Sequence, residues 1–246
     1  MTDPTEPAPS TGVRDAPEWS HHHRDVSGGW LRPTVFGAMD GLITNASLII
    51  GVGGGGAPVR TLLLTGLAGL AAGSLSMAAG EYISVTSQNE LITAETAIEQ
   101  DKLTRFPDAE QKELTQTLIG YGLNPTLAAQ AATDISRDPK TALRMHTREE
   151  FGLDPDNLPS PWVAAAASLA AFAVGAIIPL LPYLAGARTV LISLLVVAIA
   201  LFGGGTIVAT LTRRPAARGG ARQLLLGALA AAITYSIGRL IGTSVT

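Results

Sequence analysis

Six glutamates in the polar stretch 83–158 have the residue type and spacing that suit metal binding. They are Glu95 and Glu99, four apart, Glu110 and Glu113, three apart, and the adjacent Glu149 and Glu150, with Asp154 nearby. Spacings of three and four put carboxylates on one face of a helix. Convergent carboxylates repel unless a cation lies between them, so such pairs resemble the ligands of a di-metal helical bundle. A solvated acidic face has the same spacing, and the pattern alone leaves both interpretations open.

One carboxylate, Asp40, lies inside an apolar segment. A charged side chain within a membrane helix costs about 2.5–3.5 kcal/mol on insertion scales and usually faces a pathway or a partner. The neighbouring Thr44 and Asn45 would suit a water-accessible cavity. The structural alternative is a buried aspartate that pairs with Arg239 or is hydrogen-bonded by Thr44 and Asn45.

Met77 and Glu81 are four residues apart in the next apolar segment and share a helix face. A thioether beside a carboxylate suits a transition metal better than Mg²⁺ or Ca²⁺. The alternative is a methionine that packs and a glutamate at the membrane edge. The run His21 to His23 could also bind metal, although its context favours a solvated low-complexity stretch.

The composition indicates a membrane protein. Of 246 residues, 47% are apolar and 15% are charged, whereas a soluble domain carries about 25% charged residues. The absence of cysteine excludes disulfides, thiolate zinc sites, iron–sulfur clusters and cysteine nucleophiles. A net charge of −3 gives no electrostatic case for binding nucleic acid.

Five apolar segments are long enough to cross a bilayer, which takes about 20 residues of helix. They cover 34–53, 62–82, 161–184, 189–211 and 222–243. Basic residues are numerous in alternate loops, with seven in 83–158 and four in 212–222 but one each in 54–61 and 185–188. The positive-inside rule therefore places the N-terminus and 83–158 in the cytosol and the C-terminus on the other side.

The sequence predicts an all-α fold with a cytosolic helical bundle inserted between the second and third of five transmembrane helices. The second span continues without Pro or Gly to Leu103, and Phe106-Pro107-Asp108 then breaks it, with Asp108 as N-cap. Further helices are expected over 109–119, from Pro125, and from Pro139 to Gly152. The expected domains are a disordered tail (1–30), spans one and two (31–82), a metal-binding bundle (83–158) and spans three to five (159–246).

Two long motifs resemble the first and second spans of the vacuolar iron transporter family. They are FGAMDGLITNASL at 36–48 and GSLSMAAGEYIS at 73–84. The run EEFGL at 149–153 resembles the end of that family's cytosolic metal-binding domain, and Pro179 with Pro182 resembles its third span. The resemblance covers about residues 30–243.

The resemblance implies a homodimer of five-span protomers that exports Fe²⁺ or Mn²⁺ from the cytosol in exchange for protons. Asp40 would then lie in the translocation pathway, with Met77 and Glu81 lining it near the cytosolic entrance. Cytosolic ligands would be Glu95, Glu99, Glu110, Glu113 and Glu150, with Glu149 fitting less closely. Lys102 departs from the pattern, because the resemblance leads us to expect an acidic residue there.

The expected partners are divalent metal ions, protons, the lipid bilayer and a second copy of the chain, with no cofactor beyond the transported ion. A bacterial plasma membrane is the expected location. A membrane-anchored metal sensor or buffer without transport is the main alternative. An intramembrane hydrolase is disfavoured, because Asp40 is the only carboxylate deep in a span, and no enzymatic activity is expected.

Overall fold

A computed structural model describes residues 31–152 and 156–245, and every element within them is helical. The helices are α1 (Leu31–Gly54), α2 (Val59–Arg105), α3 (Pro107–Gly120), α4 (Pro125–Ser136), α5 (Pro139–Phe151), α6 (Pro161–Ile177), the 3₁₀ turn η1 (Ile178–Leu180), α7 (Leu181–Leu184), α8 (Val190–Leu211) and α9 (Ala216–Val245). The expected tail 1–30, with its histidine run, and Asp154 lie outside the described residues.

Five helical segments are long and apolar enough to cross a membrane, which confirms the expected number and positions of the spans. They are Arg32–Gly54, Val59–Arg105, Pro161–Leu184, Val190–Leu211 and Ala216–Gly242. The third segment joins α6, η1 and α7, and its regular helix changes at Pro179 and Pro182. Proline lacks the N–H that continues an α-helical ladder, so this change is local to the two prolines.

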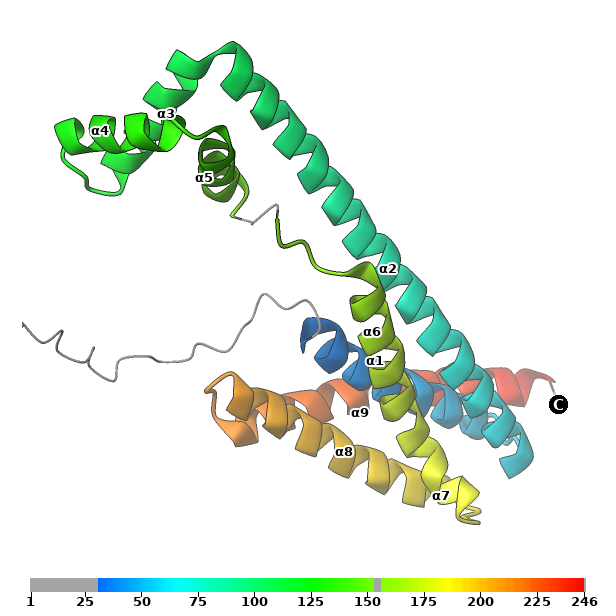
Figure 1. The fold of residues 1–246 in the computed structure, drawn as a ribbon. Helices are drawn as coiled ribbons and strands as arrows, with labels where there is room; N and C mark the ends of the chain where they lie inside the picture. Colours follow the sequence, from blue (N-terminus) through cyan, green and yellow to red (C-terminus); the bar gives the residue numbers. More distant parts are fainter. Residues whose placement is uncertain (1–30, 153–155, 246) are drawn as a thin grey trace, which may run out of the picture.

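Helix α1 packs between α6 and α9, and α8 packs beside α9 (Figure 1). Glycines allow these backbones to meet. A Cβ atom on Gly175 of α6 would lie 2.0 Å from the carbonyl oxygen of Ala38, and one on Gly41 would lie 2.2 Å from that of Phe172. Small residues at such crossings permit the close van der Waals packing that holds membrane helices together.

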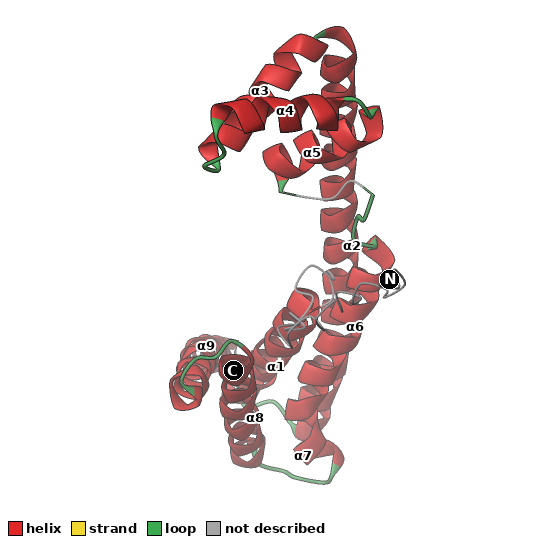
Figure 2. Cartoon of the chain, turned by 60° about the vertical axis from the view of Figure 1, so that its left-hand side comes forward, coloured by secondary structure: helices red, strands yellow, loops and turns green. Residues whose placement is uncertain are grey.

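Helix α2 extends far beyond the other spans. Its 47 residues make it about 70 Å long at 1.5 Å per residue, more than twice the roughly 30 Å of a bilayer's hydrocarbon core. The second half of α2 leads away from the remaining spans to α3, α4 and α5 (Figure 2). Near the midpoint, the rings of Tyr82 and Trp162 lie 4.7 Å apart, and Asn89 donates a hydrogen bond to the carbonyl of Pro159.

Local sequence explains the ends of the three short helices. Each begins with proline at its first helical position, where no N–H is needed. Asn124 and Asp138 cap α4 and α5 by accepting hydrogen bonds from backbone N–H groups, and Gly152 ends α5 in the left-handed conformation at φ 64°. The prediction of Asp108 as N-cap was wrong, because α3 already starts at Pro107.

The short helices enclose a small apolar core. Leu114 and Leu118 of α3 pack against Ala128 and Ala132 of α4, and Met145 of α5 adds to this cluster. The alanines leave room for the leucines, so α3 and α4 approach closely. Helices α3 and α5 also contact α2, so the three short helices and the end of α2 form one unit.

We expect Gly175→Ala to lower the melting temperature of the purified protein clearly. Its added methyl group would meet the backbone of α1, which cannot move aside as a side chain can, and overpacking of this kind costs about 1–3 kcal/mol. Gly203→Ala is the matched control, because nothing lies within 4 Å of a Cβ placed there. Equal destabilisation by both substitutions would contradict the proposed role of the α1–α6 contact.

Candidate metal centre

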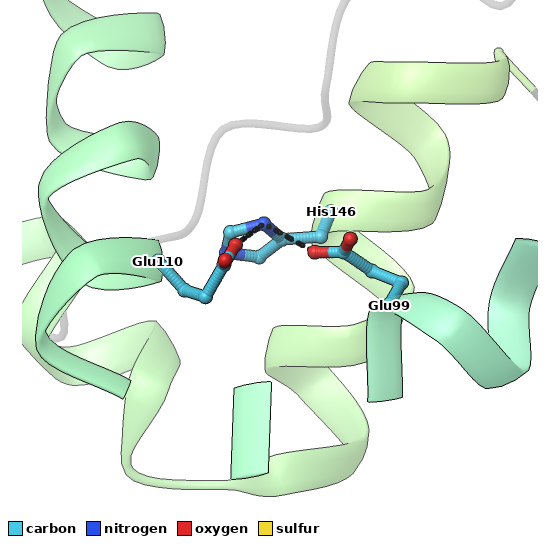
Figure 3. A group of neighbouring side chains, drawn as sticks. All are labelled: Glu99, Glu110 and His146. Carbon is cyan, nitrogen blue, oxygen red and sulfur yellow. Dashed lines mark ion pairs between the residues drawn. The ribbon is translucent and has the colours of Figure 1, made fainter. Parts of the chain in front are cut away.

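Three potential metal ligands from three helices converge at the end of α2. Glu99 of α2, Glu110 of α3 and His146 of α5 offer ligand atoms that all lie within 4.8 Å of one another (Figure 3). His146 Nδ1 lies 3.1 Å from Oε1 of Glu99 and 3.7 Å from Oε2 of Glu110. We call these three residues the acidic cluster.

The acidic cluster is buried and incompletely satisfied. Glu99, Glu110 and His146 are 1%, 6% and 4% exposed. Among the described residues, no hydrogen-bond partner is present for Oε1 of Glu99, Oε2 of Glu110 or Nε2 of His146. Buried polar atoms are rarely left without a partner, because each costs the free energy of its lost hydration. Oε1 of Glu99 and Oε2 of Glu110, which both lie near Nδ1 of His146, therefore give the cluster unused capacity for a ligand.

The electrostatics of the cluster favour a cation. Burial raises the pKa of Glu110, and the nearby carboxylates of Glu99 and Glu113 raise it further. Burial and the charge of Glu99 likewise raise the pKa of Glu150. Both carboxyl groups therefore hold protons more tightly than exposed ones do. A divalent ion would compensate the negative charge of these carboxylates more strongly than a proton does. Carboxylates with imidazole suit Fe²⁺, Mn²⁺ or Zn²⁺.

One ammonium group already contacts this region. Lys102 Nζ lies 2.9 Å from Oε2 of Glu99 and 3.8 Å from Oε1 of Glu150. Its hydrogen bond with Glu99 raises the pKa of Lys102, so the side chain stays positively charged. The position at which the sequence pattern led us to expect an acidic ligand thus holds a cation.

The structure brings only some of the predicted ligands together. Glu99 and Glu110 belong to the acidic cluster, and Glu150 contacts its edge through Lys102. Glu113 is exposed on α3 but close enough to influence both Glu110 and Glu150. Glu95 lies one turn before Glu99 and outside the three-residue cluster.

Glu149 has a different partner from the other predicted ligands. Its carboxylate accepts a hydrogen bond from the Tyr121 hydroxyl, and this contact raises the pKa of Tyr121. The bond ties the end of α5 to the residue that follows α3. In this structure Glu149 therefore fastens two helices of the bundle rather than facing the cluster.

His146 is the ligand that sequence reasoning missed. It follows the buried Ala142 by one turn and precedes Glu150 by one turn on α5. A histidine four residues before a glutamate is a metal-ligand spacing, because the two share a helix face. That signal was present but was overlooked in favour of the more numerous glutamates.

The membrane-spanning candidates occupy a separate region. Asp40 lines a cavity of about 410 Å³ between α1, α8 and α9, together with Arg32, Arg222 and Gln223. Thr44 donates a hydrogen bond to Asp40 at 3.1 Å, as the structural alternative for Asp40 requires. Asn45 instead donates to the carbonyl of Ala176, so its part in that structural alternative is not seen.

Met77 and Glu81 are half-buried on α2, and neither lines the cavity that contains Asp40. Within a single chain, the structure therefore does not assemble Asp40, Met77 and Glu81 into one site.

The described residues thus combine five helices long and apolar enough to span a membrane with a buried group of carboxylate and imidazole side chains, which defines a helical membrane protein with a candidate metal site. The model of the VIT family matches residues 31–239, so the chain belongs to the VIT family. The sequence is 31% identical to vacuolar iron transporter 1 of Oryza sativa subsp. japonica over 233 residues, which are 91% of this chain and 92% of the relative.

Two further relatives carry the same family name. Vacuolar iron transporter homolog 2 of Arabidopsis thaliana is 34% identical over 87% of this chain and 85% of its own length. Vacuolar iron transporter homolog 5 of Oryza sativa subsp. japonica is 35% identical over 87% and 82%. All three are plant proteins named for the vacuole, which gives no support to the predicted bacterial plasma membrane.

We expect the metal-free protein to lose stability as pH rises from 4.5 towards neutral. The pKa values of Glu110 and Glu150 are raised above 4.5 in the fold. Their contribution is therefore fully present below 4.5 and is lost as pH rises through the higher folded values. Melting curves with chelator from pH 4.5 to 8 test this.

Glu110→Gln should flatten this pH dependence, because the amide removes one of the two titrating groups while it keeps the shape of the side chain. Asp134→Asn is the control, since Asp134 is exposed and pairs with Arg137 at the surface. A Glu110→Gln profile parallel to that of the unmodified protein would refute the electrostatic account of the cluster.

Proposed function

We propose that this chain transports divalent transition-metal ions, Fe²⁺ or Mn²⁺, out of the cytosol in exchange for protons. The observation that carries the proposal is the buried acidic cluster, in which two carboxylate oxygens without hydrogen-bond partners lie beside the imidazole of His146. Family membership supports it, because the relatives described above are named iron transporters. The two carboxylates and imidazole would capture the ion before it reaches the membrane.

The orientation of the chain follows from its basic loops. We place the tail 1–30 and the bundle 83–158 in the cytosol and the C-terminus on the opposite side, because seven basic residues lie in 83–158 and four in 212–222. This orientation puts the acidic cluster on the side from which metal is exported. The aromatic pair Tyr82 and Trp162 would then mark the cytosolic membrane surface.

The pathway through the membrane requires two protomers in this proposal. Asp40, Met77 and Glu81 would line it at the interface of a homodimer. A groove of about 720 Å³ between α1 and α9 leaves Thr44, Ser47 and other small or apolar residues of α1 open to a partner, although none of the three pathway residues lines it. A membrane carboxylate such as Asp40 needs a polar partner or an ion, and the pathway provides both.

Exchange with protons follows from competition for the same oxygen atoms. Metal binding requires the carboxylates to be deprotonated, so protonation lowers their affinity for the ion. The raised pKa values of Glu110 and Glu150 put proton binding closer to neutral pH than in exposed glutamates. Release on the far side would depend in the same way on Asp40.

The alternative function is a membrane-anchored iron or manganese sensor or buffer. The distance between the acidic cluster and the spans favours it, since about 18 residues of α2 separate Glu81 from Glu99. A sensor would bind metal in the bundle and carry no ion across the membrane. Ion flux therefore distinguishes the two functions directly.

We expect Asp40→Asn to abolish uptake of Fe²⁺ and Mn²⁺ into proteoliposomes, because the amide keeps the shape and removes the charge that draws the cation. Metal-sensitive dye trapped in the vesicles measures the flux. Asp108→Asn, an exposed change on α3, is the control and should transport normally. Unmodified flux from the Asp40 variant would remove it from the pathway, and absent flux from the unmodified protein would favour the sensor.

Mn²⁺ should raise the melting temperature of the full-length protein, because the ion binds the folded cluster and not the unfolded chain. The gain is about 2.7 kcal/mol at a metal concentration 100 times Kd. His146→Gln should need at least about tenfold more Mn²⁺ for the same rise, since even outer-sphere changes cost that much. Identical titrations for the unmodified protein and the variant would show that His146 is no ligand.

A further inference from the structure

The two oxygen atoms of Glu99 face two different positions. Oε1 lies 3.1 Å from Nδ1 of His146, on the side where Glu110 also points. Oε2 lies 2.9 Å from the ammonium nitrogen of Lys102, which also approaches Oε1 of Glu150 at 3.8 Å. The buried carboxylate of Glu99 therefore lies between two positions. One position has candidate ligands and no cation, and the other already holds the ammonium group of Lys102.

The unpartnered atoms identify the open position. Oε1 of Glu99 and Oε2 of Glu110 lack hydrogen-bond partners among the described residues, and they lie 3.1 Å and 3.7 Å from Nδ1 of His146. Oε2 of Glu99, in contrast, accepts the hydrogen bond from Lys102. One side of the Glu99 carboxylate is thus free for an ion, whereas the other is satisfied by the chain itself.

We propose that the Lys102 ammonium group occupies the place of a second cation, so that the bundle binds one divalent ion per chain and Lys102 sets its affinity. The inference rests on the metal site of the proposed function and concerns how many ions that site accepts. Lys102 is three residues after Glu99 on α2 and so remains within reach of it. A tethered cation of this kind cannot diffuse away when metal is scarce.

The charges of the contacting groups agree with a single ion. Glu99, Glu110 and Glu150 supply three negative charges when ionised, and Lys102 supplies one positive charge. One divalent ion then brings these groups to neutrality with a neutral imidazole at His146. Without the ammonium group, a single ion would leave one buried negative charge uncompensated, which favours a second ion or a proton.

Lys102 also lowers the attraction of the open position for metal. The ammonium group and the incoming ion have like charges on the two sides of one carboxylate, and their repulsion is strong in a buried site. Removing the charge should therefore tighten binding of the first ion by on the order of tenfold or more. The simplest alternative is that the contact of Lys102 with Glu99 acts as an ordinary surface ion pair. Such a pair contributes little to stability and would leave metal binding unaltered.

The test counts Mn²⁺ bound to the full-length protein in detergent by equilibrium dialysis and elemental analysis. The number of ions bound in the bundle is the Mn²⁺ count of each protein minus the count of the same protein with Glu110→Gln. We expect one ion per chain for the unmodified protein, for Lys102→Arg and for the exposed control Lys112→Gln. We expect two ions for Lys102→Glu, with the electron paramagnetic resonance spectrum of a coupled Mn²⁺ pair.

Lys102→Gln provides a second measurement, because it removes the positive charge without adding a carboxylate ligand. It should bind its first Mn²⁺ about tenfold more tightly than the unmodified protein, whereas Lys112→Gln should not. Two ions on the unmodified protein, or unchanged number and affinity in both Lys102 variants, would overturn the inference while leaving the metal site intact. Counts that Glu110→Gln does not change would instead refute the site itself, and the inference with it.

Discussion

The repulsion between Glu99 and Glu110 is the interaction on which the rest of the bundle depends. Their carboxylates are almost completely buried and share one imidazole between them. Burying like charges is unfavourable unless a cation compensates them. Three helices are needed to hold such an arrangement together, and the proline starts, side-chain caps and alanine-rich contacts of α3 to α5 provide the necessary rigidity.

Much of the fold could be predicted from the sequence because its signals are local. Apolar length identifies the five spans, and proline and glycine identify the ends of the short helices. The error at Asp108 was also local, since Pro107 and Asp108 compete for adjacent places at the start of α3. In each case the relevant residues lie within a single helix or at its ends.

The candidate site was harder to predict because it depends on which helix faces meet. Spacing shows that Glu95 and Glu99 share a face of α2, but only packing shows that Glu99 reaches His146. The same limit explains Lys102, whose place beside Glu99 and Glu150 joins α2 to α5. A residue's type and position along one helix carry no information about the partner helix.

The uninterrupted course of α2 gives the bundle a mechanical connection to the membrane. From Glu81 to Arg105 the helix contains no glycine or proline, so this section is stiff. Glu99 lies about 27 Å beyond Glu81 at 1.5 Å per residue. A tilt of about 10° at the membrane surface would therefore carry Glu99 sideways by about 5 Å, a distance similar to the width of the cluster itself. Helix α2 is thus a lever arm, and a small rotation of its span would displace the whole bundle by a distance as large as the cluster itself.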